Sequence, residues 1–190
     1  LDNWETRAES ECDDLETAMN DLESIDLESI EQLVDSYDGY DEKVNDMENF
    51  TLLKRQLCDI QGRLFELALK ENFDCPYFIE TFMNSRAALA LDDTYDRLQW
   101  AGEEYILEEL DDEAGGLKKA GVKFDREVMY WTGYIYRYWH YYSGENSKDI
   151  YKIADAKTMN ECWLGFHTLD VEMAIDDLKE IHRQRMVAEK

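Results

Sequence analysis

The sequence predicts an all-α protein, a multi-helix bundle that carries an acidic N-terminal helical arm. One proline, Pro76, and nine glycines occur in 190 residues, so few positions interrupt a helix. Apolar residues recur every three or four positions along most of the chain, which is the spacing of one helical face. The hydrophobic fraction of 44% and the aromatic fraction of 13% exclude an intrinsically disordered chain and are sufficient for a packed core.

The acidic arm is predicted to span residues 1–46. The first fifty residues hold eighteen acids and two bases, so −16 of the formal net charge of −25 lies in this quarter of the chain. Two apolar stripes, one starting at Leu1 and one at Leu27, predict two short amphipathic helices. Their apolar faces must pack either on the rest of the chain or on a partner, and the sequence leaves both open.

Residues 47–190 are predicted to form the bundle domain. A long helix is expected from about 41 to 71, followed by a helix with Pro76 in its first turn. Asp92 or Asp93 is expected to cap a third helix that extends to about residue 110, and the Gly115-Gly116 pair predicts a loop over about 112–124. Asp125 is expected to cap an aromatic helix that ends at 143–146. Short helices over 147–153 and 156–164 and a last helix from about Asp170 complete the prediction.

The aromatic helix is the most unusual element of the sequence. A helix that is apolar on nearly all sides is typical of a bundle centre, and we prefer this interpretation. The alternative is a partner-binding surface, because Tyr, Trp and Arg are enriched at binding hot spots. The residues expected on that surface are Tyr130, Tyr134, Arg137 and Tyr141, while Trp131, Ile135, Tyr138 and Tyr142 are expected on another face.

Catalytic and metal-binding motifs are weak in this sequence. It contains no Gly-rich phosphate loop and no G-x-S-x-G. Two residues separate Arg137 from His140, fewer than the four to six found in helical ribonucleases of the HEPN type. Glu104 and Glu108 lie four residues apart and could share a divalent cation, but no clean second motif follows. The four cysteines form no C-x-x-C and are expected to be reduced thiols. We therefore predict no enzyme, no cofactor and no metal site.

The net charge of −25 restricts the class of partner. Direct binding to nucleic acid or to anionic lipid needs a basic surface, so we expect neither kind of binding. A basic protein partner fits this charge, and a homo-oligomer is left open. No apolar run approaches the roughly 18 residues of a membrane span, and we expect a cytoplasmic location.

Two stretches of the sequence resemble a known group of proteins. They are Asp92-Asp93-Thr94-Tyr95-Asp96-Arg97-Leu98-Gln99-Trp100-Ala101-Gly102-Glu103-Glu104-Tyr105, and Tyr134 to Tyr142 followed by Ser147 to Ile153. Both resemble uncharacterised, antitoxin-like and mobile-element-associated helical proteins of Gram-positive bacteria. The resemblance covers about residues 75–182 and carries no catalytic motif. It implies a protein that acts by binding.

We therefore predict an antitoxin-like protein that binds and inhibits a basic toxin through its acidic arm. The alternative is a DNA-mimicking inhibitor of a host defence nuclease, of the anti-restriction or anti-CRISPR kind, and a divalent-metal helical hydrolase is the third hypothesis. The expected apolar contacts in the arm are Trp4, Leu15, Met19, Ile25 and Ile30. The expected acidic contacts are Asp13, Asp14, Glu16, Asp21 and Glu23.

Overall fold

The computed structural model describes residues 52–93 and 96–188, and within these ranges the protein is an all-α multi-helix bundle, as predicted. An isolated antiparallel bridge between Phe73 and Lys119 supplements the helices. The described residues all belong to one compact unit, residues 51–190. The predicted arm and the predicted domain boundary after residue 46 lie outside the described residues.

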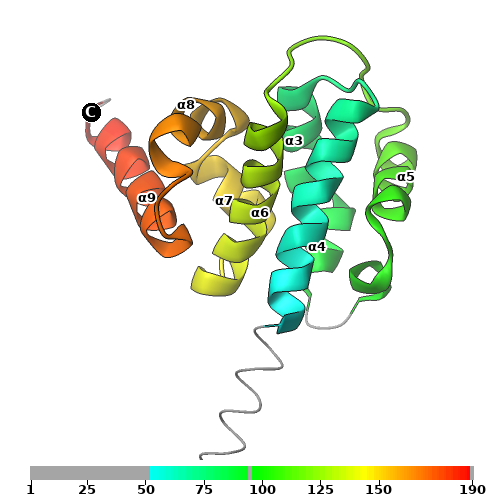
Figure 1. Cartoon of the computed structure of the whole chain (residues 1–190), viewed down its shortest axis with the longest axis horizontal. Helices are drawn as coiled ribbons and strands as arrows, with labels where there is room; N and C mark the ends of the chain where they lie inside the picture. The colour runs from blue at the N-terminus through cyan, green and yellow to red at the C-terminus, as the bar shows by residue number, and fades with distance from the viewer. Residues whose placement is uncertain (1–51, 94–95, 189–190) are drawn as a thin grey trace, which may run out of the picture. The chain divides into compact units, whose positions relative to one another are not determined.

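The helices of the described chain pack around α6, which lies at the centre of the bundle (Figure 1). α6 contacts α7, α8 and α9, and its opposite side meets the first described helix, which covers residues 52–70. The elements that follow this helix are α3 (Cys75–Met83), α4 (Arg86–Asp92), the 3-10 helix η1 (Arg97–Trp100), α5 (Glu103–Ala114), α6 (Arg126–Ser143), α7 (Ser147–Ile153), α8 (Ala156–Phe166) and α9 (Val171–Ala188).

Most of the predicted helix boundaries are confirmed. Pro76 lies in the first turn of α3, where a missing N–H removes no helical hydrogen bond. Gly115 and Gly144 follow α5 and α6 in the left-handed conformation, which glycine adopts without steric cost. The predicted helix 147–153 is α7, and α8 extends two residues beyond the predicted end at 164.

The prediction of one helix that starts at Asp92 or Asp93 and extends to about residue 110 is wrong. Asp92 is instead the last residue of α4, a short helix capped by Ser85. Asp96 caps η1 through a hydrogen bond from the Leu98 amide, and α5 begins separately after Gly102. Asp92 is unavailable as a cap because its carboxylate binds Arg137 of α6, a long-range contact that local sequence cannot reveal.

A hydrophobic cluster fills the space between the helices. Phe65 of the 52–70 helix makes edge contacts with Phe78 and Phe82 of α3, each at 5.3 Å between ring centroids. Tyr136 and Trp139 bring the inner side of α6 to the same cluster. Burial of these large side chains provides the main driving force for folding.

Two glycines allow the 52–70 helix and α6 to cross in close contact. A Cβ atom at Gly133 would lie 2.4 Å from the backbone oxygen of Gln61, and one at Gly62 would lie 2.8 Å from the Tyr130 ring. Both distances are too short for a side chain, so the crossing depends on glycine at these positions. The close approach sets which residues of α6 face the 52–70 helix and which face outward.

Candidate protein-binding surface

Four tyrosines at four-residue intervals form a continuous row along α6: Tyr130, Tyr134, Tyr138 and Tyr142. The rings of Tyr130 and Tyr134 stack with centroids 6.1 Å apart, and those of Tyr134 and Tyr138 with centroids 6.3 Å apart. These separations match the roughly 6 Å that four residues add along an α-helix. We call this set the tyrosine row.

Carboxylates from two other helices hold three hydroxyls of the tyrosine row. Tyr130 donates a hydrogen bond of 2.5 Å to Asp59 Oδ1 of the 52–70 helix. On the other side, Tyr138 donates to Glu172 Oε1 of α9 at 2.9 Å and Tyr142 to Asp176 Oδ2 at 3.4 Å. We call the row together with Asp59, Glu172 and Asp176 the tyrosine–carboxylate strip.

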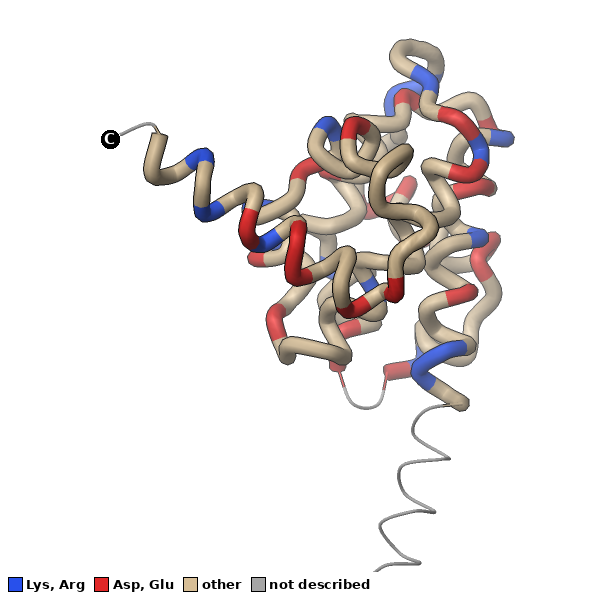
Figure 2. The backbone as a smooth tube through the Cα atoms, turned by 60° about the vertical axis from the view of Figure 1, so that its left-hand side comes forward, with Lys and Arg blue, Asp and Glu red and all other residues tan. Residues whose placement is uncertain are grey.

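The strip combines aromatic area with negative charge. Three of its rings are half-buried, and Tyr142 is 45% exposed. Burial, reinforced by the bond to Glu172, raises the pKa of Tyr138 to about 12, so the hydroxyl stays a donor at neutral pH. Figure 2 shows acids along the first half of α9, where Glu172 and Asp176 lie, and bases in its final turns.

Arg137 lies on the inner side of α6, within a polar network that joins four helices. Its side chain is 1% exposed. Its Nε donates to Gln61 Oε1 at 2.8 Å and its Nη1 to Asp92 Oδ1 at 2.7 Å. Ser147, the first residue of α7, donates to both oxygens of Asp92, from its amide at 2.8 Å and from its hydroxyl at 2.7 Å. The buried charge of Arg137 is therefore paired with Asp92 and hydrogen-bonded to Gln61.

Two further residues of α6, Tyr141 and His140, lie on this inner side. The Tyr141 ring packs against Lys54, whose Nζ is 4.9 Å from the ring centroid, and against Arg137. His140 lies with Nδ1 2.8 Å from the backbone oxygen of Glu145 and 3.7 Å from Asp92. Burial first, and then the nearby Arg137 charge, lower the pKa of His140. The ring is thus a neutral structural donor rather than a poised acid.

The structure therefore splits the four residues of α6 that were predicted to share a partner-facing surface. Tyr130 and Tyr134 lie in the tyrosine row, whereas Tyr141 packs inward and Arg137 is buried, so the expectation for Arg137 as a surface contact does not fit its position. Positions seven residues apart on a helix stay at nearly the same angle and here follow the seam with the 52–70 helix. Each four-residue step turns by about 40° and leads away from that seam toward α9.

Sequence reasoning missed most of the strip. Tyr138 and Tyr142 were assigned to another face, although their four-residue spacing from Tyr134 was a signal that could have found them. The three carboxylates come from helices distant in sequence and carried no local signal. The predicted arm contacts lie outside the described residues: Trp4, Asp13, Asp14, Leu15, Glu16, Met19, Asp21, Glu23, Ile25 and Ile30.

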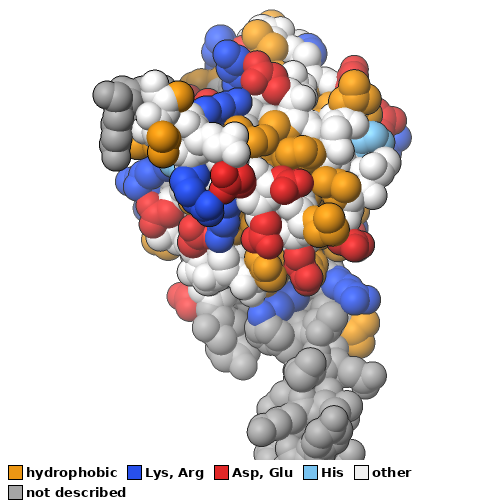
Figure 3. All heavy atoms as spheres, turned by 90° about the vertical axis from the view of Figure 1, so that its left-hand side faces the viewer, with side chains coloured by type: hydrophobic (Ala, Val, Ile, Leu, Met, Phe, Trp, Pro, Cys, Tyr) orange, Lys and Arg blue, Asp and Glu red, His pale blue; other side chains and the backbone are white. Residues whose placement is uncertain are grey.

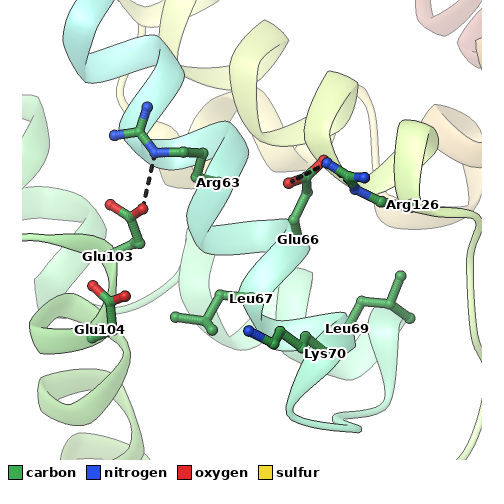
Figure 4. Close-up of a pocket in the computed structure, with 8 residues that line it drawn as sticks. All are labelled: Arg63, Glu66, Leu67, Leu69, Lys70, Glu103, Glu104 and Arg126. Carbon is green, nitrogen blue, oxygen red and sulfur yellow. Dashed lines mark hydrogen bonds and ion pairs between the residues drawn. The ribbon is translucent and has the colours of Figure 1, made fainter.

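A charged groove of about 540 Å³ lies between the 52–70 helix, α5 and the start of α6 (Figure 4). Arg63 pairs with Glu103 at 2.9 Å, and Arg126 pairs with Glu66 at 2.9 Å, so these opposite charges largely neutralise one another. Glu104, a candidate metal ligand in the third hypothesis, lines this groove. Among the described residues, no three His, Cys, Asp or Glu side chains are arranged to hold a metal ion.

The end of the bundle formed by α8 and α9 exposes apolar side chains among acidic ones (Figure 3). Leu164 is 75% exposed, and Met173, which follows Glu172 of the strip, is 54% exposed. None of the described helices is long and apolar enough to cross a membrane.

Comparison with known proteins gives no relative for this chain. No family model matches it, and neither the curated proteins nor the solved structures contain a match. The charge of the sequence and the geometry described above are therefore the observations that bear on function.

Proposed function

We propose that the chain is an antitoxin-like protein that binds and neutralises a basic protein partner. The observation that carries this proposal is the tyrosine–carboxylate strip, in which three tyrosine hydroxyls are held by carboxylates from two other helices. Rigid tyrosines give a large contact area with little loss of side-chain entropy on binding. The carboxylates beside them favour arginine and lysine side chains of a partner.

The overall charge supports the same class of partner. A formal charge of −25 attracts a basic protein over long range and speeds its association at low ionic strength. Because −16 of that charge lies in the first fifty residues, the acidic arm is assigned to the same role. A cytoplasmic location and the resemblance to antitoxin-like proteins belong to this proposal.

The test is to purify the tagged full-length chain from its native host at low salt and identify any stoichiometric partner by mass spectrometry. The expected partner is a basic protein whose toxicity or nuclease activity is abolished when the purified chain is added back. The complex should dissociate as salt is raised, because screening weakens charge attraction. A chain that elutes alone, or a partner whose activity is unchanged, would contradict the proposal.

The contribution of the arm can be separated from general acidity by matched variants. Replacing Asp13 and Asp14 with Asn and Glu16 with Gln is expected to weaken neutralisation several-fold. The control removes three exposed acids of the bundle, Glu108, Asp112 and Asp177, and so changes the net charge equally. Equal loss in both variants would assign the effect to net charge alone. Inhibition that is competitive with duplex DNA would favour the DNA-mimic alternative.

A further inference from the structure

The strip has the repeat of an α-helix that lies alongside it. Its first and last tyrosines, Tyr130 and Tyr142, are twelve residues apart, about 18 Å along the axis of α6. A partner helix running beside α6 presents side chains at the same four-residue interval. An extended segment repeats every two residues and covers about 20 Å in six residues, so it drifts out of register over the same distance.

The charge differs between the four tyrosine positions of the strip. Asp59 binds the hydroxyl of Tyr130, Glu172 that of Tyr138 and Asp176 that of Tyr142, so the first, third and fourth positions are acidic. Among the described residues, no carboxylate accepts a hydrogen bond from the hydroxyl of Tyr134, the second tyrosine of the row. The carboxylate bonds of the strip therefore lie at its first, third and fourth tyrosines.

The three carboxylates retain capacity for a ligand. Each tyrosine bond uses one oxygen, Asp59 Oδ1, Glu172 Oε1 or Asp176 Oδ2, and among the described residues no donor reaches the second oxygen. Two other cations near the strip are already engaged: Arg63 pairs with Glu103, and Lys179 pairs with Glu145 at 2.7 Å. The second oxygens of these three carboxylates therefore remain open to an external partner.

This inference rests on the proposed function and names the partner of the same surface. We propose that the strip docks an arginine-bearing α-helix of the basic partner, with arginines opposite Tyr130, Tyr138 and Tyr142. Arginine fits better than lysine because its planar guanidinium binds a carboxylate and packs flat on an aromatic ring at the same time.

The test measures how designed peptides bind the full-length protein, by fluorescence anisotropy at physiological ionic strength. The probe is a labelled, alanine-based helical peptide with arginines at a first position and at eight and twelve residues after it. One control peptide has the same composition with its arginines spread around the helix, and another places them at the two-residue spacing of an extended chain. The probe is expected to bind at least about tenfold more tightly than either control. Equal binding of the three peptides would overturn the proposal, and preference for the extended spacing would replace the helix by a strand.

Matched variants of the protein locate the binding. The pair Glu172→Gln and Asp176→Asn removes two exposed acids four residues apart on α9, and the pair Glu108→Gln and Asp112→Asn does the same on α5. The α9 pair is expected to weaken probe binding about tenfold, and the α5 pair less than about twofold. Equal losses would show that only net charge matters, and would overturn the assignment to the strip. Unchanged circular dichroism of both variants serves as the folding control.

The same variants separate this inference from the proposed function. If the α9 pair neutralises the natural partner as well as the unaltered chain does, the strip is not the docking site, while the neutralising function stands. If the probe binds in register but the chain co-purifies with no basic protein, the strip is supported and the neutralising function is overturned.

Discussion

The two sides of α6 use similar residues for opposite purposes. On the inner side, Arg137 and His140 bind polar groups of other helices and are removed from water. On the outer side, the hydroxyls of Tyr138 and Tyr142 bind exposed carboxylates of α9. The difference shows that an aromatic helix at the centre of a bundle can both fill a core and leave tyrosines at the surface. Substitutions inside should reduce stability, whereas substitutions outside should reduce binding.

The largest expected effect is on the inner side, at Arg137. Replacing Arg137 with Met leaves the buried Asp92 carboxylate without its cation, which costs about 3–5 kcal/mol of unfolding free energy. Urea denaturation measures this loss. Replacing the exposed Arg55 with Met is the control and should change stability by less than about 0.5 kcal/mol. If Arg137→Met kept full stability and lost partner binding, the division between the two sides of α6 would be wrong.

The helix crossing gives the next largest effect. Gly133→Ala places a Cβ atom against the Gln61 backbone oxygen and should force the two helices apart, at a cost of about 1–3 kcal/mol. Gly165→Ala in α8 is the matched control, because a Cβ atom there meets nothing within 4 Å. This control should gain up to about 1 kcal/mol from better helix propensity. Comparable stability of the two variants would argue against the close crossing.

Acid should destabilise the inner side through His140. Its pKa is lowered in the folded chain, so below the ordinary value of 6.5 the unfolded chain takes up the proton first. The free energy of unfolding should therefore fall as the pH drops below about 6.5, before most carboxylates titrate. His140→Gln should flatten this slope in urea titrations at each pH. An unchanged slope would mean that His140 titrates equally in the folded and unfolded states.

Alkali should act, more weakly, on the outer side. The pKa of Tyr138 is raised from 10.0 to about 12, so its contribution to stability is present below pH 10 and is lost as pH rises toward 12. Tyr138→Phe should reduce the loss of stability in this range while changing stability at pH 7 by less than about 1 kcal/mol. A steeper alkaline loss in the variant than in the unaltered chain would contradict the assigned bond to Glu172.

The sequence predicted the fold better than the surface. Helix periods, Pro76 and the glycines after α5 and α6 are local signals, and the structure confirms the elements they predicted. The errors at Asp92 and Arg137 have one cause, because these two residues pair across 45 positions of sequence. Local spacing also placed Arg137 beside Tyr130 and Tyr134. It could not show that this line of residues is the seam with another helix.

The glycine crossing also has a consequence for how this protein can diverge. Since a Cβ atom at Gly133 would meet the backbone of Gln61, which cannot move aside, natural variants should retain this glycine. Gly62 and Tyr130 are linked in another way, because a side chain at Gly62 needs the Tyr130 ring to shift. Tyr138 and Tyr142 bond to α9 and are free of this restriction, so lineages of this protein should diverge at these two positions first.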